Sequence, residues 1–188
     1  ESELDRVETL LDGVMRLASA EHRLTEQKAG DALPDAAVRG QKIDVGQMLA
    51  EEVERQSEAA GLVGNRLVLD ASAASGPAAI AWCNGFDLQQ MLAELVGNAL
   101  KYAPGSKIVL GLGLHQLTVE IQIRDHGPGM SAADLANAAD RFWRAEQVRH
   151  RPGTGLGLAI VDRLARANAG GLTLESAPGQ GLKATISL

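Results

Sequence analysis

A glycine-rich loop at residues 153–157 is the first segment of this chain that could bind an anion. Its sequence, Gly-Thr-Gly-Leu-Gly, runs directly into the apolar stretch Leu158–Val161, which is typical of a helix. Bare backbone N–H groups and a helix N-terminus then lie at one place, and the anion most often bound there is a phosphate. The loop lacks the Gly-Lys-Ser/Thr ending of a P-loop, and Leu158 stands where a dinucleotide fingerprint would have its last glycine. By itself the loop therefore predicts a phosphate site of no particular class.

Three polar side chains on one predicted helix could bind a metal–triphosphate complex. The helix is expected over residues 87–102, before Pro104 and Gly105. Within it Glu94, Asn98 and Lys101 recur at i, i+4 and i+7, so they share one face. Mg²⁺ takes oxygen ligands, and an ammonium group offsets phosphate charge. The same pattern is also typical of a solvated helix face, and without other evidence that interpretation is the more frequent of the two.

An aspartate between an alternating strand and two glycines could hold a base. The apolar residues of the stretch 119–123 alternate onto one face, and Asp125 continues that register. A buried carboxylate needs donors, which an adenine amino group and an ordered water supply. Gly127 and Gly129 then let the backbone turn sharply and approach a flat ring closely. A turn aspartate in an ordinary loop is the alternative, and the inward register only slightly disfavours it.

Aromatic and basic side chains alternate in the segment that precedes the glycine-rich loop. Phe142 and Trp143 lie between Arg141 and Arg144, and the basic run 149–151 follows. Beside a phosphate loop this segment could be a lid that acts as an electrostatic clamp, or the two aromatic residues could simply pack the loop down. The histidines are scattered, and neither zinc spacing nor a Ser/His/Asp set is visible.

Composition excludes several classes of function. The chain has 188 residues, a net charge of −6 and 3% aromatic residues, which argues against binding to a nucleic-acid backbone or stacking on its bases. The single cysteine, Cys83, excludes an internal disulfide and favours a core position in a reducing compartment. No run is apolar enough to span a membrane, and there is no signal peptide. Because the chain begins at Glu1, we expect a piece of a longer protein, which leaves an upstream membrane anchor as an open alternative.

The elements that must position these residues mix helices and strands without regular alternation, which predicts an α+β two-layer domain. Besides the helix at 87–102, helices are expected at about 46–60 and after the glycine-rich loop. Strands are expected around 43–45, at 66–69 and 79–82, in a hairpin at 107–114 and 117–124, and at 172–174 and 184–186.

A strongly amphipathic helix is expected at residues 1–27. One apolar row at spacings of three and four comprises Leu4, Val7, Leu11, Val14 and Ala18, and a second row comprises Leu10, Leu17 and Leu24. Such a helix needs a partner, and the pattern supports packing on its own domain and dimerisation equally. The Gly- and Pro-containing stretch 28–40 is expected to be a linker.

Taken in order, these segments resemble the sequence boxes of the histidine-kinase catalytic domain, within the superfamily that includes Hsp90, DNA gyrase and the mismatch-repair ATPases. Residues 94–102 resemble the N box, 125–129 the G1 box, 141–144 the F box and 153–157 the G2 box. The resemblance covers residues 43–188, and four motifs in order are far more specific than one. It implies a Bergerat-type α+β two-layer sandwich, with a mixed, mostly antiparallel sheet covered by helices on one face and preceded by one long helix.

The resemblance also implies ATP and Mg²⁺ as cofactors and assigns roles by position. Catalysis is implied for Glu94, Asn98 and Lys101, of which Asn98 and Glu94 would hold the metal. Asp125 would accept from the adenine amino group in a pocket shaped by Gly127 and Gly129. The residues implied to contact the nucleotide are Asn98, Lys101, Tyr102, Asp125, Gly127, Gly129, Arg144, Gly153, Thr154, Gly155, Leu156 and Gly157. Phosphoryl transfer mainly requires positioning and charge neutralisation, which such a set supplies.

Two positions depart from the family pattern. Glu94 stands where many histidine kinases carry asparagine, and in the ATP-hydrolysing relatives a glutamate there is the general base that activates water. Its role as base or metal neighbour is therefore open. Ala139 stands where the F box often has phenylalanine.

The implied organisation is a partial dimerisation hairpin at residues 1–27, a linker at 28–40 and an ATP-binding catalytic domain at 41–188. The implied function is the cytoplasmic catalytic portion of a two-component sensor histidine kinase, which transfers the γ-phosphoryl group of Mg–ATP to a histidine of the hairpin. His22 is followed by Arg-Leu-Thr and does not qualify as the phosphoacceptor. We therefore expect this chain to bind ATP without phosphorylating itself.

The implied partners are a second copy of the kinase and a response regulator, without nucleic acid. Three alternatives remain at this point. An ATP-hydrolysing clamp of the Hsp90/gyrase type is favoured by Glu94 and disfavoured by the short chain and the leading helix. The others are an anti-sigma-type serine kinase and a nucleotide-sensing dimerisation module without turnover.

Overall fold

The computed structural model describes residues 40–70, 79–115, 118–149, 151 and 153–188, together with positions 7, 11, 13–15, 17–22 and 25 of the N-terminal helix. Its helices are α2 (Val45–Leu62), α4 (Gly85–Tyr102), α5 (Ala132–Asn137) and α6 (Gly157–Ala167), with a 3-10 turn η1 (Glu146–Val148). Its strands are β1 (Gln41–Asp44), β2 (Arg66–Leu69), β3 (Ile80–Cys83), β4 (Lys107–His115), β5 (Thr118–Arg124), β6 (Gly171–Ser176) and β7 (Leu182–Ser187).

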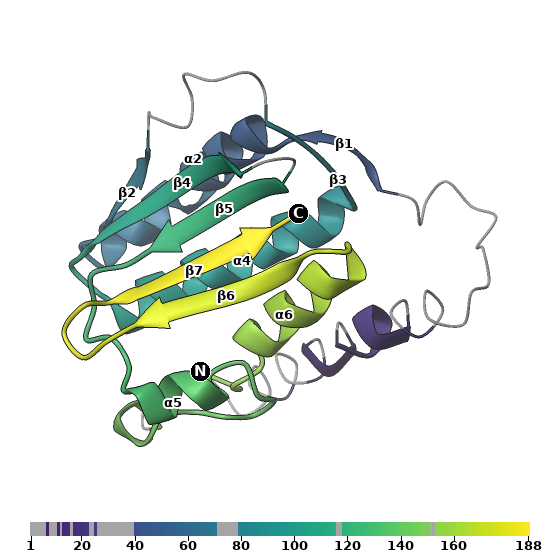
Figure 1. Ribbon diagram of the computed structural model, residues 1–188. Coiled ribbons are helices and arrows are strands. Elements are labelled where there is room, and N and C mark those ends of the chain that lie inside the picture. The colour runs from purple at the N-terminus through teal and green to yellow at the C-terminus, as the bar shows by residue number, and fades with distance from the viewer. Residues whose placement is uncertain are drawn as a thin grey trace.

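The main sheet has five strands in the order β2-β4-β5-β7-β6, of which only β2 and β4 pair in parallel. Helices α2, α4 and α6 cover one face of this sheet (Figure 1). The predicted α+β two-layer architecture with a mixed, mostly antiparallel sheet is therefore confirmed. The strands β1 and β3 form a separate two-stranded antiparallel sheet, which the sequence did not indicate.

The core lies between the main sheet and its helices. Along β5 the buried residues Val119, Ile121 and Ile123 alternate, as predicted, and the last two pair with the buried Ile186 and Ala184 of β7. The apolar face of α4 is buried against them, through Leu88, Met91, Leu92 and Leu95. Cys83 is also buried in this core, as expected.

Hydrogen bonds join the start of α4 to the end of α6. Asn84 caps the start of α4, where its side chain accepts from the N–H groups of Phe86 and Asp87 at 3.0 and 3.2 Å. Asn168, at the end of α6, accepts from the Asn84 N–H at 2.7 Å and donates to the Asp87 carboxylate at 2.9 Å. The start of α4 is thereby tied to the end of α6, so the two helices run in opposite directions.

Small differences from the sequence prediction have local causes. Val45 begins α2 rather than ending a strand, because the Asp44 side chain accepts from the Gln47 N–H at 3.1 Å and caps the helix. The predicted hairpin is observed as β4 and β5, although its turn at 116–117 lies outside the described residues, as does the linker up to residue 39.

The described positions of the N-terminal segment are all helical, as predicted. Of the second apolar row, Leu17 is buried against the domain, whereas Leu10 and Leu24 lie outside the described residues. In the first row Val7 and Leu11 are about three-fifths exposed, at 60% and 61%. One face of the helix therefore packs on its own domain and leaves the other face exposed. Within the described part of the chain, no helix combines the length and apolarity that crossing a bilayer requires.

Candidate functional site

The middle of α4 meets the beginning of α6 at Gly157. A Cβ atom added to Gly157 would lie 2.8 Å from Glu94 Oε2 and 3.1 Å from Asn98 Nδ2. Both side chains therefore reach the N-terminus of α6, where unpaired N–H groups favour negative charge. The predicted polar stripe is not simply a solvated face, because Glu94, Asn98 and Lys101 are all only partly exposed. The site therefore lies between α4 and the N-terminus of α6, and a side chain at position 157 would fill the space between them.

Lys101, near the end of α4, points at the glycine-rich loop, called the phosphate loop below (residues 153–157). A Cβ atom on Gly153 would overlap the Lys101 ammonium, and it would lie 3.7 Å from the Tyr102 hydroxyl. The Lys101 ammonium also lies 4.8 Å from the centroid of the Tyr102 ring. The structure therefore brings Lys101 and Tyr102 to the same end of the phosphate loop.

The phosphate loop has a conformation that requires glycine. Gly155 has a φ of +73°, and a Cβ atom there would lie 2.8 Å from the Phe142 carbonyl carbon and from the Trp143 oxygen. Leu156 is 1% exposed and anchors the loop in the core just before α6 begins. The Thr154 hydroxyl accepts from the Leu156 N–H at 3.3 Å. The loop is thus fixed at its C-terminal end and opens onto the helix N-terminus, as expected for an anion site.

Asp125 lies at the end of β5 and is 7% exposed, which agrees with its predicted inward register. Its Oδ1 atom accepts from the Gly127 N–H at 2.8 Å and from the Leu182 N–H at 3.2 Å. Both of these bonds use the same oxygen, so Oδ2 stays available on the carboxylate for a further donor.

The glycines after Asp125 are required by close packing. A Cβ atom on Gly127 would lie 2.7 Å from Ala103 Cβ, directly after the end of α4. Gly129 has a φ of +69°, and a Cβ atom there would overlap the Ala177 carbonyl oxygen. The loop 125–129 is thereby pressed between the end of α4 and the turn that joins β6 to β7.

That turn supplies residues that the sequence reasoning missed. Gly181 has a φ of +71°, and any side chain there would overlap the Asp125 carbonyl oxygen. The Ser176 hydroxyl accepts from the Met130 N–H at 2.8 Å and donates to the Gly181 oxygen at 2.6 Å. The run Pro-Gly-Gln-Gly at 178–181 is typical of a tight turn, but only the pairing of β5 with β7 brings it against Asp125.

Arg144 reaches the phosphate loop and binds backbone carbonyls there. Its guanidinium group donates to the oxygens of Gly153 at 2.9 Å, Val148 at 2.7 Å and Arg151. Its Nε atom is buried and has no hydrogen-bond partner among the described residues. Arg151 in turn donates to the Lys101 carbonyl oxygen at 2.7 Å. The structure thus brings the Lys101 and Arg144 side chains to Gly153, while Arg151 binds the backbone of Lys101.

The oxygen donors at the α6 N-terminus suit a hard cation. A carboxylate and an amide fit Mg²⁺, which usually binds few protein oxygens and keeps waters and phosphate oxygens as its other ligands. Among the described residues, no group of three or more His, Cys, Asp and Glu side chains could form an all-protein metal cage. Burial and the nearby Asp87 charge raise the pKa of the Cys83 thiol to about 11, so this cysteine is no nucleophile.

This chain is similar to known proteins. Residues 83–188 match the family described as histidine kinase-, DNA gyrase B- and HSP90-like ATPase. The sensor histidine kinase MtrB of Mycobacterium tuberculosis is 30% identical over 182 residues, which are 96% of this chain and 30% of that protein. The sensor-like histidine kinase SenX3 of Mycolicibacterium smegmatis is 31% identical over 168 residues, which are 88% of this chain and 42% of that protein.

The fold also matches a solved structure. The crystal structure of full-length ShkA in complex with AMPPNP aligns with a TM-score of 0.76 and 24% identity, over 97% of this chain and 35% of that one. At this identity the likeness establishes the fold alone. The chain spans less than half the length of each of these three proteins.

Proposed function

This chain belongs to the histidine kinase-, DNA gyrase B- and HSP90-like ATPase family, and from that premise we propose that it binds Mg–ATP as the catalytic domain of a sensor histidine kinase. The observation that carries the proposal is the convergence of Glu94 and Asn98 on the N-terminus of α6, with Lys101 at the adjoining phosphate loop. Metal ligands, a phosphate cradle and a cation are the parts that phosphoryl transfer requires.

In this proposal Asn98 holds Mg²⁺ and Glu94 lies beside it. The bound cation would neutralise charge on the phosphates, as it does in other phosphoryl-transfer sites. Lys101 and Arg144 contact the phosphates, and the N–H groups of the phosphate loop wrap them. Because Arg144 now donates to the loop carbonyl of Gly153, we infer that it changes partners when phosphate binds.

The adenine ring is assigned to the loop 125–129. Asp125 Oδ1 is held by two backbone N–H groups, so Oδ2 is the acceptor for the exocyclic amino group. Gly127 and Gly129 shape the pocket by letting this loop pack closely against Ala103 and Ala177. Tyr102 lies near the nucleotide, on the Lys101 side.

We further propose that the γ-phosphoryl group passes to a histidine on a dimerisation hairpin, and that the full protein then passes it to a response regulator. Residues 1–27 would belong to the second helix of that hairpin and residues 28–40 to the linker. The names of the relatives support this proposal, since they are sensor histidine kinases. We assign the domain to the cytoplasm, where ATP and response regulators occur, and expect this chain not to autophosphorylate.

A second candidate function is ATP hydrolysis. Glu94 favours it, because its carboxylate lies at the α6 N-terminus, beside Asn98, where a general base could orient water. Hydrolysis would release phosphate without labelling any protein.

Replacing the proposed metal ligand tests the binding site. In Asn98→Ala we expect the affinity for Mg–AMPPNP, measured by calorimetry, to fall at least about tenfold. In excess EDTA the parent and the variant should bind the nucleotide alike, because the lost amide acts through the metal. Asn137→Ala removes an exposed amide on α5 and serves as the control. Equal Mg–AMPPNP affinity in Asn98→Ala and the parent would show that Asn98 is not a ligand.

A further inference from the structure

The connection between α2 and β2 carries a buried polar side chain, Asn65, to which the proposed function gives no role. Asn65 is 7% exposed, and its Oδ1 atom is buried without a hydrogen-bond partner. Among the described residues the only other buried side-chain atom without a partner is Arg144 Nε, at the phosphate loop. Because a buried oxygen without a donor costs free energy, an asparagine at this position favours a role for the other end of its amide.

The other end of the amide binds the turn that follows α4, called the α4–β4 turn below (residues 103–106). The Asn65 Nδ2 atom donates to the carbonyl oxygens of Ala103 at 2.7 Å and Ser106 at 3.0 Å. Since a carbonyl can only accept, these two partners fix the orientation of the amide and leave Oδ1 on the unpaired side. Asn65 therefore ties the connection between α2 and β2 to the end of α4.

Other hydrogen bonds also hold the α4–β4 turn, but they do not tie Ala103 to the rest of the domain. Backbone bonds to the connection between α2 and β2 are made by the Gly105 N–H at 3.1 Å and the Ser106 oxygen at 3.2 Å. Inside the turn, the Ser106 hydroxyl donates to the Ala103 oxygen at 2.8 Å. Within the part of the chain that the structure describes, only Asn65 reaches the Ala103 carbonyl from outside the turn.

Ala103 is the residue of this turn that supports the base loop, the name used below for residues 125–129. Ala103 is 2% exposed, and a Cβ atom built on Gly127 would lie 2.7 Å from the Ala103 Cβ atom. The Gly127 N–H in turn donates to Asp125 Oδ1 at 2.8 Å. A shift of Ala103 would therefore reach the Asp125 carboxylate through one packing contact and one hydrogen bond.

We propose that Asn65 is a positioning residue for base recognition. It holds Ala103 against Gly127 and thereby fixes the Asp125 carboxylate at the place where the adenine amino group donates. This inference rests on the proposed function, because it concerns how the same site recognises its base. The proposed metal site lies instead between α4 and the N-terminus of α6, so the Mg²⁺-dependent part of the nucleotide affinity should not depend on Asn65.

Asn65→Leu tests this role, because leucine has nearly the shape of asparagine and lacks its donors. Neither carbonyl is left unpaired, since the Ala103 oxygen keeps the Ser106 hydroxyl and the Ser106 oxygen keeps a backbone N–H. We therefore expect the urea midpoint of unfolding to change little, as the buried unpaired oxygen is lost together with the two bonds. In calorimetric titration ATP should bind about three- to tenfold more weakly, the change that one hydrogen bond supplies, and equally so with Mg²⁺ and in excess EDTA.

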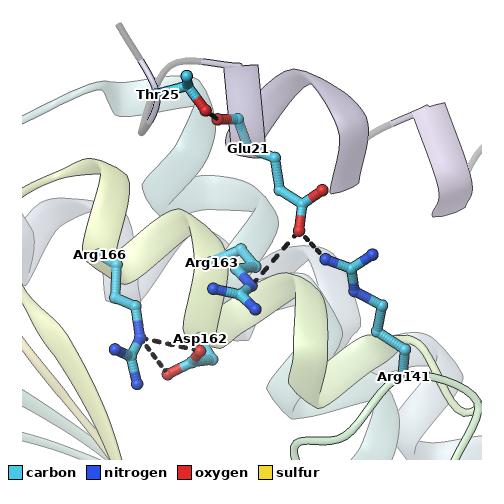
Figure 2. Close-up of polar contacts among 6 residues, drawn as sticks. All are labelled: Glu21, Thr25, Arg141, Asp162, Arg163 and Arg166. Atoms are coloured by element: carbon cyan, nitrogen blue, oxygen red, sulfur yellow. Dashed lines mark hydrogen bonds and ion pairs between the residues drawn. The ribbon is translucent and has the colours of Figure 1, made fainter. Parts of the chain in front are cut away.

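Base selectivity separates a positioning role from a structural one. Inosine triphosphate has no exocyclic amino group to donate to Asp125, so its affinity should fall less than that of ATP. Ser106→Ala removes the second side-chain donor to Ala103 and should weaken ATP binding by a smaller factor. Thr25→Val is the control, because it also removes a bond from a side chain to a backbone carbonyl, that of Glu21 at 2.9 Å, at an exposed position of the N-terminal helix (Figure 2).

Hydrogen exchange without nucleotide provides a readout that does not depend on binding. We expect the Gly127 amide to exchange faster in Asn65→Leu than in the parent and in Thr25→Val. Unchanged ATP affinity in Asn65→Leu would overturn the inference whatever the urea midpoint does, and so would equal losses for ATP and inosine triphosphate or a loss that disappears in EDTA. If Asn65→Leu does not fold, Ser106→Ala decides in the same way.

Failure of the proposed function gives a different result. If the parent binds neither nucleotide, the proposed function fails, while faster exchange of Gly127 in Asn65→Leu would still show that Asn65 holds the base loop. Unchanged exchange in that case would overturn both.

Discussion

Replacing Asp125 by asparagine should change which base the site accepts while leaving the fold intact. The Oδ1 atom of Asp125 accepts from two backbone N–H groups, at 2.8 Å from Gly127 and 3.2 Å from Leu182. Asparagine keeps an oxygen for these two donors, so the free energy of unfolding should change little. At the other oxygen an acceptor becomes an NH₂ donor, which faces the adenine amino group instead of accepting from it.

The expected size follows from the loss of one hydrogen bond to a charged group. Such a bond contributes about 1.5–3 kcal/mol, and 1.4 kcal/mol corresponds to a tenfold change in affinity. ATP binding should therefore weaken roughly 10- to 100-fold. Inosine triphosphate carries a carbonyl in place of the amino group, so Asp125→Asn should bind it at least as well as the parent does.

Calorimetric titration of ATP and inosine triphosphate against both proteins measures this change. Asp44→Asn is the matched control, because asparagine caps α2 as well as aspartate and the same charge is lost. Thermal melting confirms that the variant is folded. If Asp125→Asn binds ATP as the parent does, or loses both nucleotides equally, the assignment of Asp125 to the base is wrong.

Two further predictions concern the supports of this site. Gly181→Ala should weaken ATP binding and lower the free energy of unfolding by about 2 kcal/mol or more, because a side chain at a φ of +71° would overlap the Asp125 carbonyl oxygen. Nucleotide titration measures the change in affinity and urea unfolding the change in stability. If neither quantity changes, the close packing of Gly181 on Asp125 is contradicted. Burial raises the pKa of Cys83 from 9.0 to about 11, so the folded state keeps its thiol proton to a higher pH than the unfolded state does. As the pH rises from about 9 to about 11, the free energy of unfolding should therefore fall by up to about 1.4 kcal/mol per pH unit. Cys83→Ala should remove this slope, and parallel pH curves for the two proteins would refute it.

Local periodicity made much of the fold and part of the site predictable. The alternation along 119–123 gave the buried face of β5 and the inward register of Asp125, because strand side chains alternate with a period of two. The helical spacing of Glu94, Asn98 and Lys101 gave their common face. The spacing could not show that this face lies against the N-terminus of α6 at Gly157.

The remaining features depend on contacts between segments far apart in the sequence. Ser176 and Gly181 reach the Asp125 loop only because β7 pairs with β5. Nothing in the sequence of either short strand indicates that β1 pairs with β3. For the N-terminal helix the pattern supported packing on its own domain and dimerisation equally. Only the structure shows that Leu17, of the second apolar row, faces inward while Leu11, of the first row, is exposed.

Phosphotransfer to a hairpin supplied in trans tests the central claim most directly. The domain is mixed with γ-labelled ATP, Mg²⁺ and a separate dimerisation hairpin that carries a phosphoacceptor histidine, and the stability of the labelled product is then followed. We predict acid-labile, base-stable label on the hairpin, no label on the domain alone, and loss of transfer in Asn98→Ala. Stoichiometric release of phosphate without labelled protein would contradict the kinase assignment and support an ATPase in which Glu94 activates water.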